Sequence, residues 1–329
     1  MSAKFAMLGN QGLHPVDEKA TFLLDVLQGF SKPKKSLSSK YFYDEAGSEL
    51  FNQITRHPDY YLTQSEIAIL DHNKNELADL LANSSFNLVE LGPGEGLKTQ
   101  VLLNAFLKKQ LSFSYYAIDI SHKYLHHLVD KFNQETPDLD AIALNGDYLQ
   151  GIQWLGSHSK KRNFLLFLGS SIGNFNLSAA TEFLLLLRGF LHPGDYLLIG
   201  FDLLKEIDIL LRAYNDNDGI TRQFNLNLLK RMNRELGANF NLDSFYHYGT
   251  FNAYSKAMES YLISNKEQIV YFSALNKSFS FKEFEAIHVE SSQKYTLSEI
   301  NKLASAAQCK VVKNFTDSKC RFVNSLWQV

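Results

Sequence analysis

Several features that would assign this chain to a specialised class are scarce or missing. Only two of its 329 residues are cysteine, Cys309 and Cys320, which excludes a framework of several disulfides and indicates a reducing compartment. The six prolines leave no long proline-rich linker. The longest apolar runs, such as Phe183–Leu187, are too short to span a membrane, and the first fifteen residues do not look like a signal peptide. We therefore expect a soluble, cytoplasmic protein.

The chain also lacks an excess of positive charge. Its 33 lysines and arginines are balanced by 35 acidic residues, which gives a formal net charge of −2. A nucleic-acid-binding protein normally carries a clear basic excess, so we do not expect a nucleic-acid partner. Apolar residues, in contrast, are plentiful: 45% of the chain is hydrophobic, enough to fill a substantial core. The length suits two domains, or one large domain that carries an insertion.

The middle of the chain alternates predicted strands with predicted helices. The strands are short apolar runs that end at Gly, Asp or Asn, as is typical of buried parallel strands. They are Asn87–Leu91, Tyr115–Ile120, Ala141–Leu144, Phe164–Leu168 and Tyr196–Phe201. The clearest helices, with apolar residues three and four apart, are Leu97–Leu107, His122–Phe132 and Ala179–Leu191. This alternation predicts an α/β fold with a doubly wound, Rossmann-like sheet and helices on both of its faces.

The regions on either side have different patterns. Asp17–Leu81 and Lys205–Leu236 are expected to be mainly helical, and the second of them to end at Gly237. Aromatic and β-branched residues in near-alternation predict antiparallel strands within Phe245–Ser264 and Phe279–Tyr295.

The end of the chain is expected to return to the sheet. A helix is predicted at Leu297–Ala306, and two strands are predicted within Lys310–Val329. The segment after Phe201 would then be an α+β insertion in the sheet domain. The expected division is residues 63–202 with 297–329 for the sheet domain, and residues 1–62 with 203–296 for the other.

A glycine-rich turn follows the first predicted strand and leads directly into a helix. It reads Glu90-Leu91-Gly92-Pro93-Gly94-Glu95-Gly96-Leu97-Lys98. Glycine lets the backbone turn sharply and lets a ligand approach the main chain, so we expect Gly92 and Gly94 to contact a cofactor. A Gly-x-Gly pair alone is a weak signal. Its place at the carboxyl end of a parallel strand, where open α/β sheets bind ligands, makes the signal stronger.

Acidic residues near this turn bear on the kind of ligand. They are Glu90, Asp119 and Asp147, and the third glycine comes one position too early for a dinucleotide-binding fingerprint. Negative charge disfavours a diphosphate but suits ribose hydroxyls, an adenine amino group and a cationic centre, all of which S-adenosylmethionine has. Asp119 would bind the ribose, Asp147 the adenine, and Lys98 the methionine carboxylate. A dinucleotide remains an alternative, as does no cofactor, with the acids only capping the helices that follow.

Blocks of residues outside the turn resemble one family. They include Tyr43-Asp44-Glu45-Ala46-Gly47, Pro58-Asp59-Tyr60-Tyr61, Gly169-Ser170-Ser171-Ile172-Gly173-Asn174 and Asn233-Arg234-Glu235-Leu236-Gly237, in that order. On these blocks the chain resembles, over nearly its whole length, the histidine-specific Nα-methyltransferases of ergothioneine biosynthesis. The resemblance implies methyl transfer from S-adenosylmethionine to the α-amino group of histidine, up to the trimethylated betaine. It also implies that the sheet domain is the methyltransferase domain and that the other domain binds substrate.

The resemblance further implies roles for individual residues. The implied cofactor contacts are Gly92, Lys98, Asp119, Asp147 and Tyr148. The implied substrate contacts are Tyr60, Asn174, Tyr214, Glu290 and Ser292, with Asn174 and Tyr214 near the amino-acid carboxylate and the other three facing the imidazole. Tyr43 is the expected catalytic group, because its hydroxyl can relay a proton and orient the lone pair of the amine. By pattern alone, aromatic and polar residues of this kind are more often core, turn or surface positions.

Two departures from the family pattern bear on the substrate. Leu62 follows the tyrosine pair where the family usually has proline, and Ser260 lies where known members have a pocket methionine. A small polar residue would enlarge or rewet that side of the pocket. Two other readings stay open: a related enzyme that methylates another amino acid or amine, and a non-catalytic sensor of the cofactor. His122 and His126 share a helix face without a third ligand, so no metal is expected.

Overall fold

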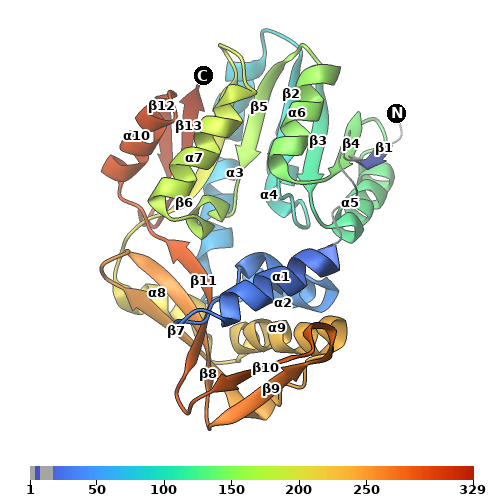
Figure 1. Cartoon of the computed structure of the whole chain (residues 1–329). Coiled ribbons are helices and arrows are strands. Elements are labelled where there is room, and N and C mark those ends of the chain that lie inside the picture. Colours follow the sequence, from blue (N-terminus) through green and yellow to red (C-terminus); the bar gives the residue numbers. More distant parts are fainter. Residues whose placement is uncertain (1–3, 8–17) are drawn as a thin grey trace. The chain divides into compact units, whose positions relative to one another are not determined.

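The computed structural model describes residues 4–7 and 18–329, and these divide into two compact units. The first, called the sheet unit, contains residues 4–7, 62–204 and 294–329. The second, called the inserted unit, contains residues 18–61 and 205–293. Both can be followed by colour in Figure 1.

An eight-stranded sheet forms the centre of the sheet unit. Its strands are β1 (Lys4–Met7), β2 (Phe86–Leu91), β3 (Phe113–Asp119), β4 (Ala141–Asn145), β5 (Arg162–Phe167), β6 (Tyr196–Asp202), β12 (Lys310–Thr316) and β13 (Phe322–Gln328). They lie in the order β1-β4-β3-β2-β5-β6-β13-β12, and only the last two pairs, β6 with β13 and β13 with β12, are antiparallel. The chain runs outward from β2 through β3 to β4 and then returns to β5. The strand order therefore reverses between β2 and β5, and in such sheets ligands bind at the carboxyl ends flanking this point.

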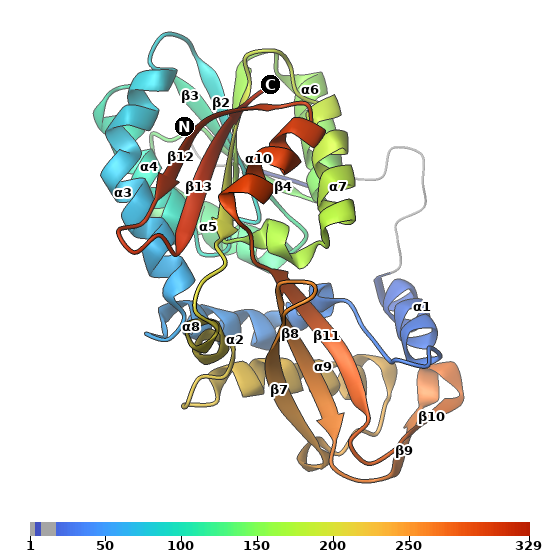
Figure 2. The same cartoon turned by 90° about the vertical axis from the view of Figure 1, so that its left-hand side faces the viewer.

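Helices cover both faces of this sheet. Figures 1 and 2 show α3 (Tyr61–Leu81), α4 (Leu97–Lys108) and α5 (His122–Glu135) over one face. On the other face lie α6 (Tyr148–His158), α7 (Leu177–Gly189) and α10 (Leu297–Ala306). The predicted doubly wound α/β fold is confirmed. α6 was not among the helices singled out from the sequence, because its apolar residues are interrupted by Gly151, Gln153 and Gly156.

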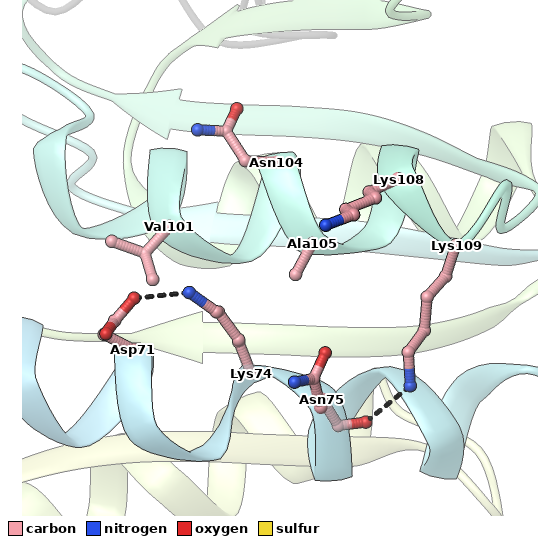
Figure 3. A pocket seen from close by; sticks show the side chains of 8 residues that line it. All are labelled: Asp71, Lys74, Asn75, Val101, Asn104, Ala105, Lys108 and Lys109. Atoms are coloured by element: carbon pink, nitrogen blue, oxygen red, sulfur yellow. Dashed lines mark hydrogen bonds and ion pairs between the residues drawn. The ribbon is translucent and has the colours of Figure 1, made fainter.

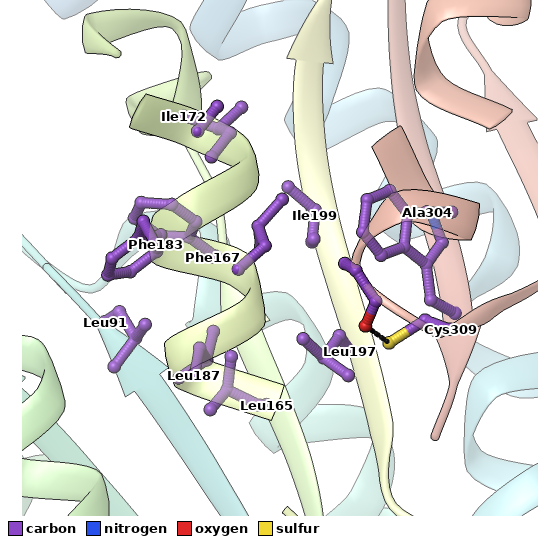
Figure 4. Packing of buried hydrophobic residues seen from close by; sticks show 14 of the residues in the cluster. Leu91, Leu165, Phe167, Ile172, Phe183, Leu187, Leu197, Ile199, Ala304 and Cys309 are labelled. Atoms are coloured by element: carbon purple, nitrogen blue, oxygen red, sulfur yellow. Dashed lines mark hydrogen bonds between the residues drawn. The ribbon is translucent and has the colours of Figure 1, made fainter. Parts of the chain in front are cut away.

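The core under α7 shows why the apolar runs become buried strands. Leu165 and Phe167 of β5 and Leu197 and Ile199 of β6 alternate toward this face, where they meet α7 side chains such as Leu187 (Figure 4). All five are at most 1% exposed. Burial of a large aliphatic or aromatic side chain contributes about 1.5–3 kcal/mol, so this layer stabilises the edge from which the glycine turn and its neighbours project.

The domain boundaries differ from the expected ones at Lys4–Met7 and, by one to three residues, at Leu62, Leu203–Leu204 and Lys294–Thr296. Lys4–Met7 were expected in the second domain, which is wrong, because they pair in parallel with β4 as the edge strand β1. Lys294 and Tyr295 were also expected there, yet the Tyr295 N–H donates to the Asp202 carbonyl at 2.9 Å, and the Lys294 ammonium pairs with the Asp202 carboxylate. A four-residue edge strand and a crossing segment have no periodicity of their own, so only their tertiary pairing reveals where they belong.

The inserted unit has an α+β architecture. Its helices are α1 (Glu18–Phe30), α2 (Glu45–Arg56), α8 (Ile207–Tyr214) and α9 (Ile220–Leu236), with a 3₁₀ turn, η1, at Ser39–Phe42. Its strands are β7 (Phe245–Asn252), β8 (Ala257–Ser264), β9 (Gln268–Phe272), β10 (Lys277–Phe281) and β11 (Ala286–Gln293). β11, β8 and β7 form an antiparallel sheet in that order, and β9 and β10 form a hairpin. Gly237 ends α9 with φ 61°, the left-handed C-terminal residue that the sequence predicted.

No helix within residues 4–7 and 18–329 combines the length and apolarity needed to cross a bilayer.

Candidate functional site

The glycine turn after β2 requires glycine at three positions. Gly92, Gly94 and Gly96 have φ values of 69°, 54° and 71°, which are in the left-handed region that other residues adopt only with strain. A Cβ at Gly92 would lie 2.8 Å from the Tyr148 hydroxyl, and a Cβ at Gly96 would lie 2.8 Å from a Leu128 methyl. A Cβ at Gly94 would have no neighbour within 4 Å. Gly94 therefore leaves an open approach to the main chain of the turn.

The ends of β3 and β4 meet this turn. Asp119 ends β3 and accepts a hydrogen bond from the Ser121 N–H at 2.8 Å. Burial raises the pKa of Asp119 to about 6. Tyr148 begins α6 after β4, and its pKa is raised by burial and then by the negative charge of Asp119. Tyr148 is next to Gly92, and its pKa is affected by the charge of Asp119. These three expected cofactor contacts therefore lie together at adjacent strand ends.

Asp147 lies at the same edge but acts first as a cap. It is exposed, and its Oδ1 accepts the Gln150 N–H at 2.9 Å as the N-cap of α6. One carboxylate oxygen of Asp147 therefore caps a helix, as the sequence allowed. A carboxylate has two oxygens and about four acceptor sites, so a cap leaves room for a ligand donor.

Glu90 faces the interior and not the turn. It is 2% exposed, and its carboxylate accepts hydrogen bonds from the hydroxyls of Thr99 and Tyr115. Burial raises its pKa, while the nearby charge of Lys98 lowers it. Glu90 therefore anchors the base of α4 under the turn and is not positioned to contact a ligand.

Lys98, in the first turn of α4, is held by a residue that the sequence did not single out. Its ammonium is 2.9 Å from a carboxylate oxygen of Glu66 on α3, which is fully buried. Glu66 also accepts hydrogen bonds from the Gly169 N–H at 2.8 Å and from the Asn324 amide at 2.9 Å. A Cβ at Gly169 would lie 2.8 Å from the Lys98 ammonium, so the absence of a side chain at Gly169 leaves room for Lys98. An ammonium has three donors, so Lys98 can still bind an anionic group.

Asn174 lies beyond the neighbouring strand. It ends the 3₁₀ turn η2 (Ser171–Asn174), which follows β5, and it is exposed. The chain reaches it through Gly169 and Ser170, whose φ values of 78° and 58° turn the backbone sharply after the strand. Asn174 thus follows the strand end on the other side of the point at which the strand order reverses.

The two expected tyrosines of the inserted unit lie around one phenylalanine. The Tyr43 ring is 5.5 Å from that of Phe51, and the Tyr60 ring is 6.3 Å from it, both edge-on. Phe224 of α9 lies 5.7 Å from Tyr43 and completes this group. Both tyrosines are half-buried. The structure therefore brings together two residues that are separated by helix α2.

The other expected substrate residues of this unit meet on the β11–β8 sheet. The Tyr214 hydroxyl, at the end of α8, donates to the Ser292 hydroxyl at 2.7 Å, and both residues are buried. Glu290 lies two positions before Ser292 on β11 and therefore on the same face of the sheet. Its carboxylate accepts a hydrogen bond from the Ser260 hydroxyl at 3.0 Å, and Ser260 lies directly opposite it on β8. Ser260 thus orients Glu290, a contact that the sequence comparison did not predict.

Two groups of expected site residues result, one in each unit. The sheet unit holds Gly92, Gly94, Lys98, Asp119, Asp147, Tyr148 and Asn174. The inserted unit holds Tyr43, Tyr60, Tyr214, Glu290 and Ser292. The first group combines carboxylates at strand ends, an ammonium and a glycine turn with an open approach, which are the residue types expected at an S-adenosylmethionine site.

Two other features do not belong to these groups. A surface groove of about 460 Å³ lies between α3 and α4 (Figure 3), lined by Asp71, Lys74, Asn75, Val101, Asn104, Ala105, Lys108 and Lys109. None of these is an expected site residue. Within the described part of the chain, no three His, Cys, Asp or Glu side chains come together in a way that could hold a metal ion.

Known proteins similar to this chain agree with the expected family. Residues 22–329 match the family described as histidine-specific methyltransferase, SAM-dependent. A histidine N-alpha-methyltransferase of Mycobacterium tuberculosis is 36% identical over 302 residues, which cover 92% of this chain and 93% of that protein. Its counterpart from Mycolicibacterium smegmatis is 38% identical over 274 residues, 82% of this chain and 83% of that protein.

A more distant relative is named for a different substrate. An L-tryptophan methyltransferase of Psilocybe serbica is 26% identical over 324 residues and covers 90% of both chains. The family match covers the described residues from Phe22 to the end of the chain, and it includes both groups of site residues. With a doubly wound sheet, a glycine turn and acids at its strand ends, this chain belongs to the family of histidine-specific, S-adenosylmethionine-dependent methyltransferases.

Proposed function

We propose that this protein transfers methyl groups from S-adenosylmethionine to the α-amino group of free L-histidine, up to the trimethylated betaine. The observation that carries the proposal is the group formed by Tyr214, Ser292, Glu290 and Ser260, which combines buried hydroxyls with a carboxylate on one sheet face. A carboxylate that accepts an imidazole N–H discriminates histidine from analogues without ring nitrogens, because those analogues offer no donor to that acceptor site. The similarity to two histidine N-alpha-methyltransferases supports the same substrate.

In this proposal the cofactor contacts come from the sheet unit. Gly92 and Gly94 allow the ligand to approach the main chain, Asp119 accepts from the ribose, Asp147 and Tyr148 hold the adenine end, and Lys98 binds the methionine carboxylate. S-adenosylmethionine, when bound, supplies an electrophilic methyl carbon on a sulfonium. The protein has to hold an amine lone pair in line with that carbon, which is mainly a positioning task.

The substrate contacts come mostly from the inserted unit. Asn174 and the Tyr214 hydroxyl bind the amino-acid carboxylate, and Glu290, Ser292 and Tyr60 bind the imidazole. Tyr43 orients the α-amino nitrogen and relays the proton that leaves it when the new N–C bond has formed. A tyrosine hydroxyl suits this relay because it can both donate and accept a hydrogen bond.

A second substrate class is favoured by one observation. Ser260 is small and polar. The relative named as an L-tryptophan methyltransferase is similar over 90% of this chain, and tryptophan has a larger side chain than histidine. A pocket with serine at this position has room for another amino acid. We keep histidine as the main proposal because Glu290 has a defined hydrogen-bond partner on this face.

A panel of free amino acids with S-adenosylmethionine, analysed by mass spectrometry, tests the proposal. We expect histidine to gain one to three methyl groups, with formation of S-adenosylhomocysteine. Turnover of tryptophan or tyrosine without turnover of histidine would select the second substrate class. Binding of the cofactor with no product from any amino acid would indicate a sensor and contradict both.

The proposed setting is a reducing, cytoplasmic compartment. Cys309 is buried and Cys320 is exposed, and both are free thiols. An exposed thiol remains reduced in such a compartment, which agrees with the proposal.

A further inference from the structure

Side chains on one face of α9 pack against and hydrogen-bond to the segment that carries Tyr43. Phe224, Asn227, Arg231 and Arg234 follow one another at steps of three and four residues, so they lie along a single face of the helix. Each of them contacts the stretch from Tyr41 to Asp44. No other role in the protein has been assigned to this face, although Arg234 belongs to one of the family blocks in the sequence.

The contacts begin with aromatic packing. The Phe224 ring lies 4.7 Å from that of Phe42 and 5.7 Å from that of Tyr43. Phe42 is fully buried, so this end of the segment cannot shift without disturbing the core of the inserted unit.

Polar contacts fix the residue that follows Tyr43. Asp44 accepts hydrogen bonds from the Asn227 amide and from an Arg234 guanidinium nitrogen, both at 2.6 Å. The same carboxylate accepts the Gly47 N–H at 2.8 Å as the N-cap of α2. Asp44 therefore joins Tyr43, the start of α2 and the face of α9 through one side chain.

Arg231 holds the other side of the segment. One of its guanidinium nitrogens donates to the Tyr41 carbonyl at 3.0 Å, and another donates to Glu235 at 3.0 Å. The guanidinium also lies over the rings of Phe22 and Tyr41, at 5.2 Å and 5.8 Å from their centroids. Since Tyr41 and Asp44 are both held, the backbone on each side of Tyr43 is anchored to α9.

We propose that Arg231, Arg234 and Asp44 are positioning residues for Tyr43, and that this face of α9 serves to set the place of the tyrosine hydroxyl in the methyl-transfer step. The inference rests on the proposed function. Catalysis by a positioned group is sensitive to displacements of about 1 Å, whereas substrate affinity spread over several other contacts is not. Loss of the contacts between α9 and this segment should therefore lower kcat more than it changes KM.

The test is a double variant, Arg231→Met/Arg234→Met, which removes both guanidinium groups and keeps much of the apolar stems. We expect kcat for histidine methylation to fall about tenfold and KM for histidine to change less than about twofold. Binding of S-adenosylhomocysteine, measured by calorimetry, should be unchanged. Arg222→Met, which alters an exposed arginine on the opposite face of the same helix, is the matched control and should leave all three quantities unchanged.

The decisive comparison repeats the double variant in a Tyr43→Phe background. If the arginines act through the Tyr43 hydroxyl, their removal should produce little further loss of kcat in that background. An equal tenfold loss in both backgrounds, or a loss expressed mainly in KM, would overturn the inference. Should the double variant fail to fold, Asp44→Asn, which keeps a capping oxygen for Gly47 and loses the charge facing Arg234, is compared in the same two backgrounds.

The outcomes also separate this inference from the proposed function. A wild-type protein that does not methylate histidine overturns both. A wild-type protein that does, with arginine and Tyr43 effects that multiply, overturns only the inference.

Discussion

At the residue scale, Ser260 is a position at which the resemblance implies a departure from the family pattern. Its hydroxyl is fully buried and donates to the Glu290 carboxylate at 3.0 Å, so the departure supplies a hydrogen bond and not merely a smaller side chain. Glu290 is half-buried, and a carboxylate in such a position is stabilised by a fixed donor, because loss of a hydrogen bond to a poorly hydrated group is costly.

Ser260→Ala should weaken recognition of the substrate side chain. The Glu290 carboxylate would lose one fixed donor, and we expect KM for histidine to rise about fivefold to tenfold, in line with about 1 kcal/mol for such a bond. Ser291→Ala is the control, because Ser291 faces the opposite side of β11. Steady-state kinetics decide: an equal effect of both changes would remove Ser260 from the substrate site.

Tyr43→Phe removes a single hydroxyl from the proposed catalytic position. We expect kcat to fall by about 10² or more with little change in KM, as for the loss of a proton-transferring group. Tyr41→Phe is the matched variant: its hydroxyl donates to Asp25 at 2.6 Å, so its loss should affect stability and leave kcat unchanged. A Tyr43→Phe enzyme with unaltered kcat would disprove the catalytic assignment.

Asp119 predicts a pH dependence of cofactor binding. Its pKa in the folded protein is raised by burial to about 6, and only the ionised carboxylate is a pure acceptor for ribose hydroxyls. Ligand binding favours the ionised form, so affinity should be constant above pH ~7 and fall about tenfold between pH ~7 and ~5. Calorimetric titration with S-adenosylhomocysteine measures this. Asp119→Asn should bind more weakly and show a flat profile; a profile identical to that of the unmodified protein would exclude Asp119 as the titrating group.

At the scale of elements, α3 and α4 are joined by two ion pairs of very different character. Lys98 pairs with Glu66, whose side chain is 1% exposed, near the strand ends. Lys109 pairs with Asp79, whose side chain is 70% exposed, at the far end of α4. The Glu66 carboxylate of the buried pair also accepts hydrogen bonds from the Gly169 N–H and the Asn324 amide. The buried pair therefore connects the helices with β13 and with the residues after β5, whereas the exposed pair connects only the helices.

This contrast predicts unequal costs for two similar substitutions. Lys98→Met leaves the Glu66 carboxylate buried without its cation and should lower the free energy of unfolding by about 3–5 kcal/mol. Lys109→Met should lower it by less than about 1 kcal/mol, since exposed pairs contribute little. Urea denaturation followed by circular dichroism compares them. Equal losses would mean that Glu66 does not depend on Lys98.

Elements were predicted well where their own periodicity carried the signal. The helix Leu297–Ala306 has the predicted bounds, and the five central strands were found to within two residues at either end. β1 was missed because it is a four-residue edge strand, and α6 was not singled out because it is interrupted by glycines. Of the candidate site, the strand-end acids followed from the fold rule, while Tyr43, Tyr60, Tyr214 and Glu290 depended on resemblance, since aromatic and acidic residues on helices and strands have no pattern that marks a site.

At the scale of the whole molecule, the chain contributes to each unit from separated segments. The sheet unit is built from residues on both sides of the insertion, and the inserted unit from residues on both sides of β2–β6. The expected cofactor contacts all lie in the first unit, and most expected substrate contacts lie in the second. Ligands should therefore protect different parts of the chain.

Hydrogen–deuterium exchange tests this division. S-adenosylhomocysteine alone should slow exchange in peptides that contain the glycine turn, Asp119 and Tyr148, because ligand binding suppresses local opening. Subsequent addition of histidine should slow exchange in peptides that contain Tyr214 and β11. Protection of β11 by S-adenosylhomocysteine alone, with none at the glycine turn, would reverse the proposed assignment of the units.

The sequence by itself determined the doubly wound sheet, the antiparallel insertion and the glycine turn at the end of β2, because these depend on local periodicity and on the conformational freedom of glycine. Only the tertiary structure decided which side chains hold the site residues: Glu66 behind Lys98, Ser260 beside Glu290, and the face of α9 around Tyr43. In each case the partners are at least 30 residues apart in the chain or on different elements, so their contact depends on how helices and strands pack and not on any pattern within one element.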